Sequence, residues 1–294
     1  MAASSSHFVT STISSVRMPR LIYGTAWKKG ATAELVITAI RAGFRGVDTA
    51  CQPKHYTEAG VGTALRTILA EGTISREDLF IQTKFTSLDG QDPASTPYDP
   101  TAPLATQVVQ SLERSLSNLG TPYVDSLVLH SPMRTVKDTL TVWKIFEGFV
   151  ASGKVKQLGI SNCYSIETFK TLFDSVSIKP AVLQNRLYPE SGYDRELRKF
   201  CAEKGIFYQS FWTLTANPTI LRDRAVVAIG RKYGKTVEQM FFAYLVQTGV
   251  VTPLTGTKNA THMAQDLEVL DMSRLDKEDA DVFENFINGA SSSS

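Results

Sequence analysis

The sequence has few cysteines, almost no net charge and no long apolar run. Its three cysteines, Cys51, Cys163 and Cys201, are an odd number without metal-ligand spacing, so we expect no metal site, and free thiols in a reducing compartment. The formal net charge is +2 and no basic run contains interleaved aromatics, which argues against nucleic acid or an anionic membrane as a partner. No stretch approaches the roughly 20 apolar residues of a membrane span. Small-molecule chemistry in the cytoplasm is therefore the expectation.

Strand-like and helix-like patterns alternate along the chain of 294 residues. Amphipathic stretches with apolar residues three or four apart separate eight short apolar runs. These eight predicted strands are Leu21–Ala26, Gly46–Ala50, Leu79–Phe85, Ser126–His130, Gln157–Ser161, Val182–Leu187, Phe207–Phe211 and Val250–Leu254. Because no Gly-x-Gly-x-x-Gly follows the first, the pattern predicts one (β/α)8 TIM barrel over residues 18–288 and not an open doubly wound sheet.

The two ends of the chain fall outside this pattern. Residues 1–17 are predicted to be a flexible N-terminus and a β-hairpin cap, with His7–Arg20 covering the N-terminal end of the barrel or, alternatively, forming a frayed tail. The acid-free Ser/Thr-rich opening faintly resembles a transit peptide, but its first arginine, Arg17, comes late for that role. Residues 289–294 are predicted to be a disordered tail.

Four polar residues, Asp48, Tyr56, Lys84 and His130, stand at or just beyond the ends of three successive predicted strands. The C-terminal ends of barrel strands converge on one mouth, where such enzymes place their chemistry. A site where negative charge develops on a substrate oxygen needs a proton donor. Tyr56 suits this role, and Lys84 is expected to lower its pKa from about 10 toward neutrality. Asp48 would pair with Lys84, and His130 would orient the substrate oxygen. The alternative is that Asp48 and Lys84 form an ion pair with a structural role only, and that His130 is hydrogen-bonded within the protein.

Six motifs in the same order resemble those of the aldo-keto reductases. They are Met18-Pro-Arg-Leu-Ile-Tyr-Gly-Thr-Ala-Trp27, Gly46-Val-Asp-Thr-Ala50 with Tyr56-Thr-Glu-Ala-Gly-Val-Gly62, Thr83-Lys84, Leu129-His130, Gly159-Ile-Ser-Asn162 and Gln184. The resemblance implies an NAD(P)H-dependent reductase of a small-molecule aldehyde or ketone, with the four polar residues as its catalytic set. The segment Cys51-Gln-Pro-Lys-His55 looks like fungal members. It lengthens the usual spacing from Asp to Tyr and places His55 beside the expected tyrosine.

The resemblance also implies where the cofactor binds. Ser161, Asn162 and Gln184 would hydrogen-bond the nicotinamide carboxamide. Phe211, with Trp212 next to it, would stack on the ring, although a core aromatic is the alternative for Phe211. The remaining expected cofactor contacts are Thr25, Thr213, Leu214, Thr257, Lys258, His262, Gln265 and Asp266.

The phosphate end departs from the common family pattern. Members that prefer the 2′-phosphate often carry Pro-Lys-Ser and a downstream Arg, whereas this chain has Thr252-Pro-Leu-Thr-Gly-Thr-Lys-Asn259, which resembles the potassium-channel β-subunit branch. Lys258 and His262 would supply positive charge, while Thr257 and Gln265 would bond the phosphate and the adenine. Alternatively, Lys258 lies on a solvated turn. NADPH is the expected cofactor, with NADH less favoured.

Substrate selection is expected in loops at the mouth. The segment Thr86–Pro103 is longer than is usual in the family, and long loops are commonly binding loops or lids. Trp27 and Tyr98 are the predicted substrate contacts, for a bulky carbonyl or for small aldehydes in general.

A cofactor-binding regulatory subunit and a redox-neutral cyclase or dehydratase with Tyr56 as acid remain alternative functions. A monomer or a weak homo-oligomer is expected.

Overall fold

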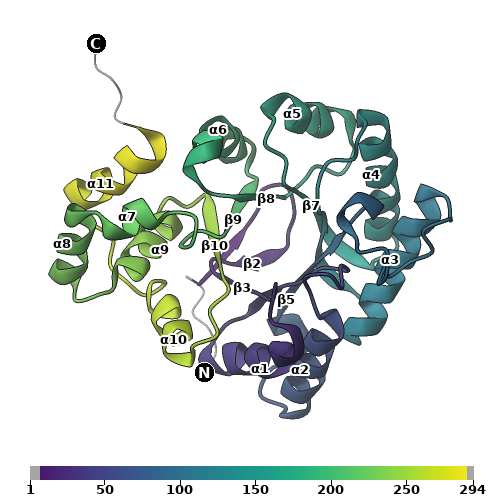
Figure 1. Cartoon of the computed structure of the whole chain (residues 1–294), viewed down its shortest axis with the longest axis horizontal. Coiled ribbons are helices and arrows are strands. Elements are labelled where there is room, and N and C mark those ends of the chain that lie inside the picture. The colour runs from purple at the N-terminus through teal and green to yellow at the C-terminus, as the bar shows by residue number, and fades with distance from the viewer. Residues whose placement is uncertain (1–6, 290–294) are drawn as a thin grey trace.

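A computed structural model describes residues 7–289 of the chain, in which eight parallel strands close into a barrel surrounded by helices (Figure 1). The strands are β3 (Ile22–Gly24), β4 (Gly46–Asp48), β5 (Phe80–Phe85), β6 (Val124–Leu129), β7 (Val155–Ser161), β8 (Val182–Arg186), β9 (Phe207–Phe211) and β10 (Val251–Thr255). They follow one another around the barrel in chain order, and β10 pairs with β3 to close it. All eight predicted strands are present, and the predicted (β/α)8 barrel is confirmed.

Helices surround the barrel. They are α1 (Thr32–Ala42), α2 (Glu58–Ala70), α3 (Leu104–Leu119), α4 (Val136–Ala151), α5 (Ile166–Ser175), α6 (Arg195–Lys204), α7 (Pro218–Arg222), α8 (Arg224–Tyr233), α9 (Val237–Gln247), α10 (Ala260–Glu268) and α11 (Lys277–Asn288). Side chains that alternate along each strand point outward to these helices or inward to the barrel axis. Helices α3, α4, α6 and α9 pack on the barrel strands, whereas α8 and α11 pack mainly on other helices. Within residues 7–289, no helix has both the length and the apolar character needed to cross a membrane.

A β-hairpin closes the N-terminal end of the barrel, as predicted. Its strands β1 (Phe8–Thr10) and β2 (Arg17–Pro19) pair antiparallel, and the fully buried Met18 packs against inward side chains of the barrel strands. The turn between them is fixed to the barrel, because the Ser11 hydroxyl donates to the Gly205 carbonyl at 2.7 Å and the Ser14 hydroxyl to Gln157 Oε1 at 2.7 Å. Strand β2 spans the domain boundary expected after residue 17. Residues 1–6 and 290–294, which fall in the predicted flexible start and the predicted disordered tail, lie outside the described residues.

Candidate active site

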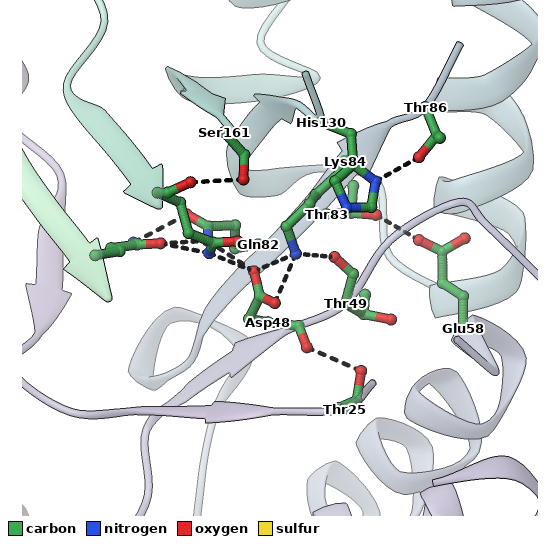
Figure 2. A network of polar contacts seen from close by, with 12 residues as sticks. Thr25, Asp48, Thr49, Glu58, Gln82, Thr83, Lys84, Thr86, His130 and Ser161 are labelled. Carbon is green, nitrogen blue, oxygen red and sulfur yellow. Dashed lines mark hydrogen bonds and ion pairs between the residues drawn. The ribbon is translucent and has the colours of Figure 1, made fainter. Parts of the chain in front are cut away.

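The predicted ion pair lies buried at the mouth end of the barrel (Figure 2). The Lys84 ammonium on β5 donates to both carboxylate oxygens of Asp48 on β4, at 2.7 and 2.6 Å, and to the Thr49 carbonyl at 2.9 Å. The side chains are 0% and 4% exposed, respectively. Thr25 is fully buried and its hydroxyl donates to the Asp48 backbone carbonyl at 2.8 Å, so Thr25 fixes the strand end that carries Asp48. Its predicted contact with the cofactor stays a prediction.

Two glutamine amides hold the Asp48 carboxylate from the barrel interior, and a third glutamine links these two. The side-chain nitrogens of Gln82 and Gln184 donate to Asp48 Oδ1 at 2.8 and 3.0 Å, and both also donate to Gln209 Oε1. Since the side-chain nitrogen of Gln184 is used in this way, its side-chain oxygen Oε1 is the group left to accept a hydrogen bond from a carboxamide. Sequence reasoning missed Gln82 and Gln209, although polar residues at inward positions of otherwise apolar strands were a detectable signal.

The loop between β4 and α2 brings Tyr56, and not His55, to the ion pair. The Lys84 ammonium lies 5.1 Å from the centroid of the Tyr56 ring, and the rings of Tyr56 and His130 are 6.1 Å apart in an edge-on arrangement. His55 instead stacks on Trp27, with ring centroids 4.0 Å apart, and its carbonyl accepts from the Trp27 amide at 2.7 Å. Trp27 is 50% exposed. The structure therefore brings the four predicted catalytic residues together.

A buried glutamate anchors the loop just after Tyr56. Glu58 begins α2, and its carboxylate accepts from the Thr83 hydroxyl at 2.6 Å and from the Asn118 amide at 3.0 Å. Because Thr83 precedes Lys84 on β5, this contact ties the loop that carries Tyr56 to the strand that carries Lys84. Sequence reasoning quoted Glu58 only as part of a motif and gave it no role.

The electrostatics of Tyr56 differ from the expectation. Burial raises the pKa of Tyr56, and the Lys84 ammonium opposes this rise without cancelling it. The expected shift toward neutrality was therefore wrong, because it considered the cation and left out desolvation. Burial and the neighbouring Lys84 lower the pKa of His130 to about 3, so the imidazole is neutral at physiological pH. The site thus combines a protonated phenol with a neutral histidine.

Thr86 contacts the histidine from the side away from the ion pair. Its hydroxyl oxygen lies 2.6 Å from His130 Nδ1, and its backbone carbonyl accepts from the Tyr98 hydroxyl at 2.7 Å and from the Gln91 amide at 3.2 Å. A hydroxyl that donates to Nδ1 leaves the hydrogen of the neutral imidazole on Nε2, where it is available to a substrate oxygen. Tyr98 is 6% exposed and anchors the long loop on Thr86. Its predicted substrate contact stays a prediction, with its hydroxyl already engaged.

Thr86→Val is expected to lower kcat about tenfold with little change in KM, because the near-isosteric valine cannot fix the tautomer of His130. The loss corresponds to one net hydrogen bond. Steady-state kinetics of Thr86→Val and Thr86→Ser would test this, since serine keeps the hydroxyl and should restore most of kcat. Equal losses in both variants would assign Thr86 a packing role only.

The predicted carboxamide-binding residues lie together beside the catalytic residues. The Ser161 hydroxyl at the end of β7 donates to the Gln184 carbonyl at 2.6 Å, and the Asn162 amide donates to the His130 carbonyl at 2.9 Å. Asn162 has a left-handed backbone with φ 51°. Phe211 ends β9, is half-buried and packs against the inward apolar side chains. This position fits both the predicted stacking role and the core alternative.

The residues after Phe211 form a short ordered turn. Trp212 is 49% exposed, whereas Thr213 is buried and its hydroxyl donates to the Ser210 carbonyl at 3.0 Å. Leu214 is half-buried and packs against the core. Of these three residues, Trp212 presents the largest free surface at the mouth.

The predicted phosphate end lies between β10 and α10. Lys258 and His262 are exposed, and Asn259 caps α10 by accepting from the backbone amides of Thr261 and His262. The Thr257 hydroxyl accepts from the Asn259 amide at 3.2 Å, which shapes the same turn.

Two further residues predicted to contact the cofactor, Asp266 and Gln265, lie on α10 and bond neighbouring residues of the protein. Burial raises the pKa of Asp266 to about 6, and its carboxyl accepts from the Thr255 hydroxyl at 2.7 Å. The Gln265 carbonyl accepts from the Gln239 amide at 2.8 Å. Their contacts with the cofactor stay predictions.

A cation that sequence reasoning missed lies beside this turn. Lys28 is 5% exposed, and its ammonium donates to the Gly256 carbonyl. Burial and the charge of Lys258 lower the pKa of Lys28 to about 8. Within residues 7–289 neither lysine forms an ion pair with a carboxylate, so the two cations present an uncompensated positive site. Such a site fits a phosphate group. Its only sequence signal was a lysine after the first strand.

Comparisons with known proteins agree with this geometry. The model of the Aldo/keto reductase family matches residues 20–288. The uncharacterized oxidoreductase YtbE of Bacillus subtilis is 31% identical over 248 residues, which cover 82% of this chain and 81% of that protein. Glyoxal reductase of the same bacterium is 30% identical over 250 residues and covers 83% of this chain and 82% of its own. The crystal structure of an aldo-keto reductase of the silkworm Bombyx mori complexed with NADPH superposes with a TM-score of 0.80 at 26% identity, covering 96% and 88% of the two chains. The chain therefore belongs to the aldo/keto reductase family.

Proposed function

We propose that this protein is an NADPH-dependent reductase that converts an aldehyde or ketone to an alcohol, with Tyr56 as general acid. The observation that carries the proposal is the buried Asp48–Lys84 pair next to a protonated Tyr56 and a neutral His130. Ser161, Asn162 and the Gln184 oxygen would hold the nicotinamide carboxamide. Lys28 and Lys258 would hold phosphate.

The residues would act on the substrate oxygen while bound NADPH supplies the hydride. His130 Nε2–H would donate to the carbonyl oxygen and orient it. The Tyr56 hydroxyl would transfer its proton to that oxygen as negative charge develops there, and the product is the alcohol. Lys84 would stabilise the tyrosinate that remains until solvent reprotonates it, and Asp48 with its glutamine amides keeps the ammonium in place.

A turnover screen tests this function. Purified protein is mixed with NADPH or NADH and with aromatic aldehydes or ketones, and the loss of reduced-nicotinamide absorbance is followed. Oxidation of many equivalents of NADPH per protein supports the reductase. Tight NADPH binding without turnover of any carbonyl would favour a regulatory subunit, and product formation without cofactor oxidation would favour redox-neutral chemistry.

Lys28→Met is expected to weaken NADPH binding at pH 7 by about tenfold or more, the scale of a charged hydrogen bond. The pKa of Lys28 is about 8, so the ammonium is present at pH 7 and is lost as the pH rises through that value. NADPH affinity should therefore fall toward alkaline pH in the wild type and change less in Lys28→Met. Quenching of protein fluorescence measures both.

The matched control is Lys199→Met, which removes an exposed lysine on α6. Comparison of NADPH with NADH identifies which phosphate Lys28 binds. A loss of affinity confined to NADPH indicates the 2′-phosphate, and equal losses of affinity for both cofactors indicate the diphosphate. Lys258→Ala should give a smaller loss confined to NADPH. Unchanged binding in Lys28→Met at both pH values would contradict the assignment of Lys28.

A further inference from the structure

Arg186, the last residue of β8, lies on the inward face of the barrel wall. Side chains alternate along the strand, so Arg186 shares its face with Val182, which packs in the barrel interior, and with Gln184, which bonds Asp48 at 3.0 Å. Two residues of a strand span roughly 6.6 Å, which places Arg186 on the solvent side of Gln184. Its register partner on β9 is Phe211. Arg186 therefore lines the mouth directly above the catalytic residues.

Two aromatic rings contact the Arg186 guanidinium. Its central carbon lies 4.2 Å from the ring centroid of Trp212 and 5.0 Å from that of Tyr188. The Arg186 backbone amide donates to the Tyr164 hydroxyl at 3.2 Å, and the rings of Tyr164 and Tyr188 are 6.2 Å apart. The two ring contacts hold the guanidinium through its faces, and its terminal nitrogens donate to no protein group within residues 7–289.

The guanidinium lacks an acidic partner within residues 7–289. Its Nε is buried without a hydrogen-bond partner, and no carboxylate in this part of the chain forms an ion pair with it. An arginine has five N–H donors in a fixed fork that matches a carboxylate, and a buried donor left unpaired is costly. An uncompensated guanidinium with an unpaired buried donor favours an anionic ligand at this position.

We propose that Arg186 binds the carboxylate of the carbonyl substrate, so that the enzyme prefers aldehydes and ketones that carry an acid group. This inference rests on the proposed function and names its substrate class. The Tyr164, Tyr188 and Trp212 rings provide the apolar wall for the carbon skeleton of such a substrate. The other anion that could reach the mouth is the diphosphate of the cofactor, but Lys28 and Lys258 supply cations for phosphate at β3 and β10, on other strands of the barrel.

A matched substrate pair tests the inference. para-Carboxybenzaldehyde and its methyl ester present the same aldehyde with and without the negative charge. The wild type should have the higher kcat/KM for the acid, and Arg186→Met should lower the ratio of acid to ester by about 10- to 100-fold, the range for a charge-assisted hydrogen bond. Arg17→Met is the control, because Arg17 also stacks on an aromatic ring, Phe8, but at the closed end of the barrel. It should keep the wild-type ratio.

Binding measurements separate the possible outcomes. Calorimetry with the product acid, para-(hydroxymethyl)benzoate, in the presence of NADP⁺ should show affinity in the wild type and a loss in Arg186→Met. If NADPH affinity falls in Arg186→Met while the acid-to-ester ratio stays the same, Arg186 binds the diphosphate and the inference is overturned. An unchanged ratio with unchanged NADPH affinity overturns it as well. If the wild type oxidises NADPH with neither aldehyde, the proposed function fails. If the wild type also does not bind the product acid, the proposed anion site at Arg186 is wrong as well.

Discussion

Tyr56→Phe is expected to lower kcat for carbonyl reduction by about 10²- to 10⁴-fold, the range that general acid catalysis contributes. The substitution deletes the hydroxyl of the ring that lies beside Lys84 and His130, and it removes no group of the proposed carboxamide and phosphate sites. Burial raises the pKa of Tyr56, so the wild-type donor stays protonated through the neutral range. NADPH affinity, measured by fluorescence quenching, should stay close to that of the wild type.

The neighbouring histidine provides the control for this experiment. His55 stacks on Trp27, away from the ion pair, and burial with the charge of Lys54 lowers its pKa. If His55 donated the proton, His55→Gln would abolish reduction and Tyr56→Phe would not. Retention of more than about a tenth of wild-type kcat in Tyr56→Phe would rule out Tyr56 as the general acid, given the range cited.

Lys84→Met should remove both activity and stability, and the two losses can be separated. Burial alone would lower the pKa of Lys84, but the Asp48 carboxylate and Tyr56 outweigh it and raise the pKa, so the ammonium persists at neutral pH. Its removal leaves the Asp48 carboxylate buried without its cation, which costs about 3–5 kcal/mol of the free energy of unfolding. Tyr56 also loses the cation that stabilises its anion, so kcat should fall strongly.

The double variant Asp48→Asn/Lys84→Met distinguishes a structural role from a catalytic one. With both charges gone, much of the lost free energy of unfolding should return, because no unpaired charge remains buried. Activity should not return, since the cation near Tyr56 is still absent. Urea unfolding and steady-state kinetics on the same preparations measure both. Recovery of activity together with stability would show that Lys84 is needed only for folding.

Much of this architecture could be predicted from residue patterns because the signals are local. Each strand run and each amphipathic stretch is contiguous, and Asp48, Lys84 and His130 stand at strand ends that any closed parallel barrel brings together. The role of Lys28 could not be predicted. Its contact with Gly256 joins the segments after the first and last barrel strands, and it depends on the closure of the barrel between β3 and β10. The contact of Thr86 with His130 depends on rotamers. The raised pKa of Tyr56 depends on burial, which strand patterns do not report.

The contact between the long loop and Thr86 has a consequence for enzyme engineering. Loops at barrel mouths can vary in sequence, and with them specificity, while the barrel itself is retained. Here Tyr98 and Gln91 hold the carbonyl of the residue whose hydroxyl contacts His130. A graft that replaces residues 87–103 without equivalent contacts would alter turnover along with selectivity. Libraries built on this scaffold should therefore vary the remainder of the loop and keep those two side chains constant.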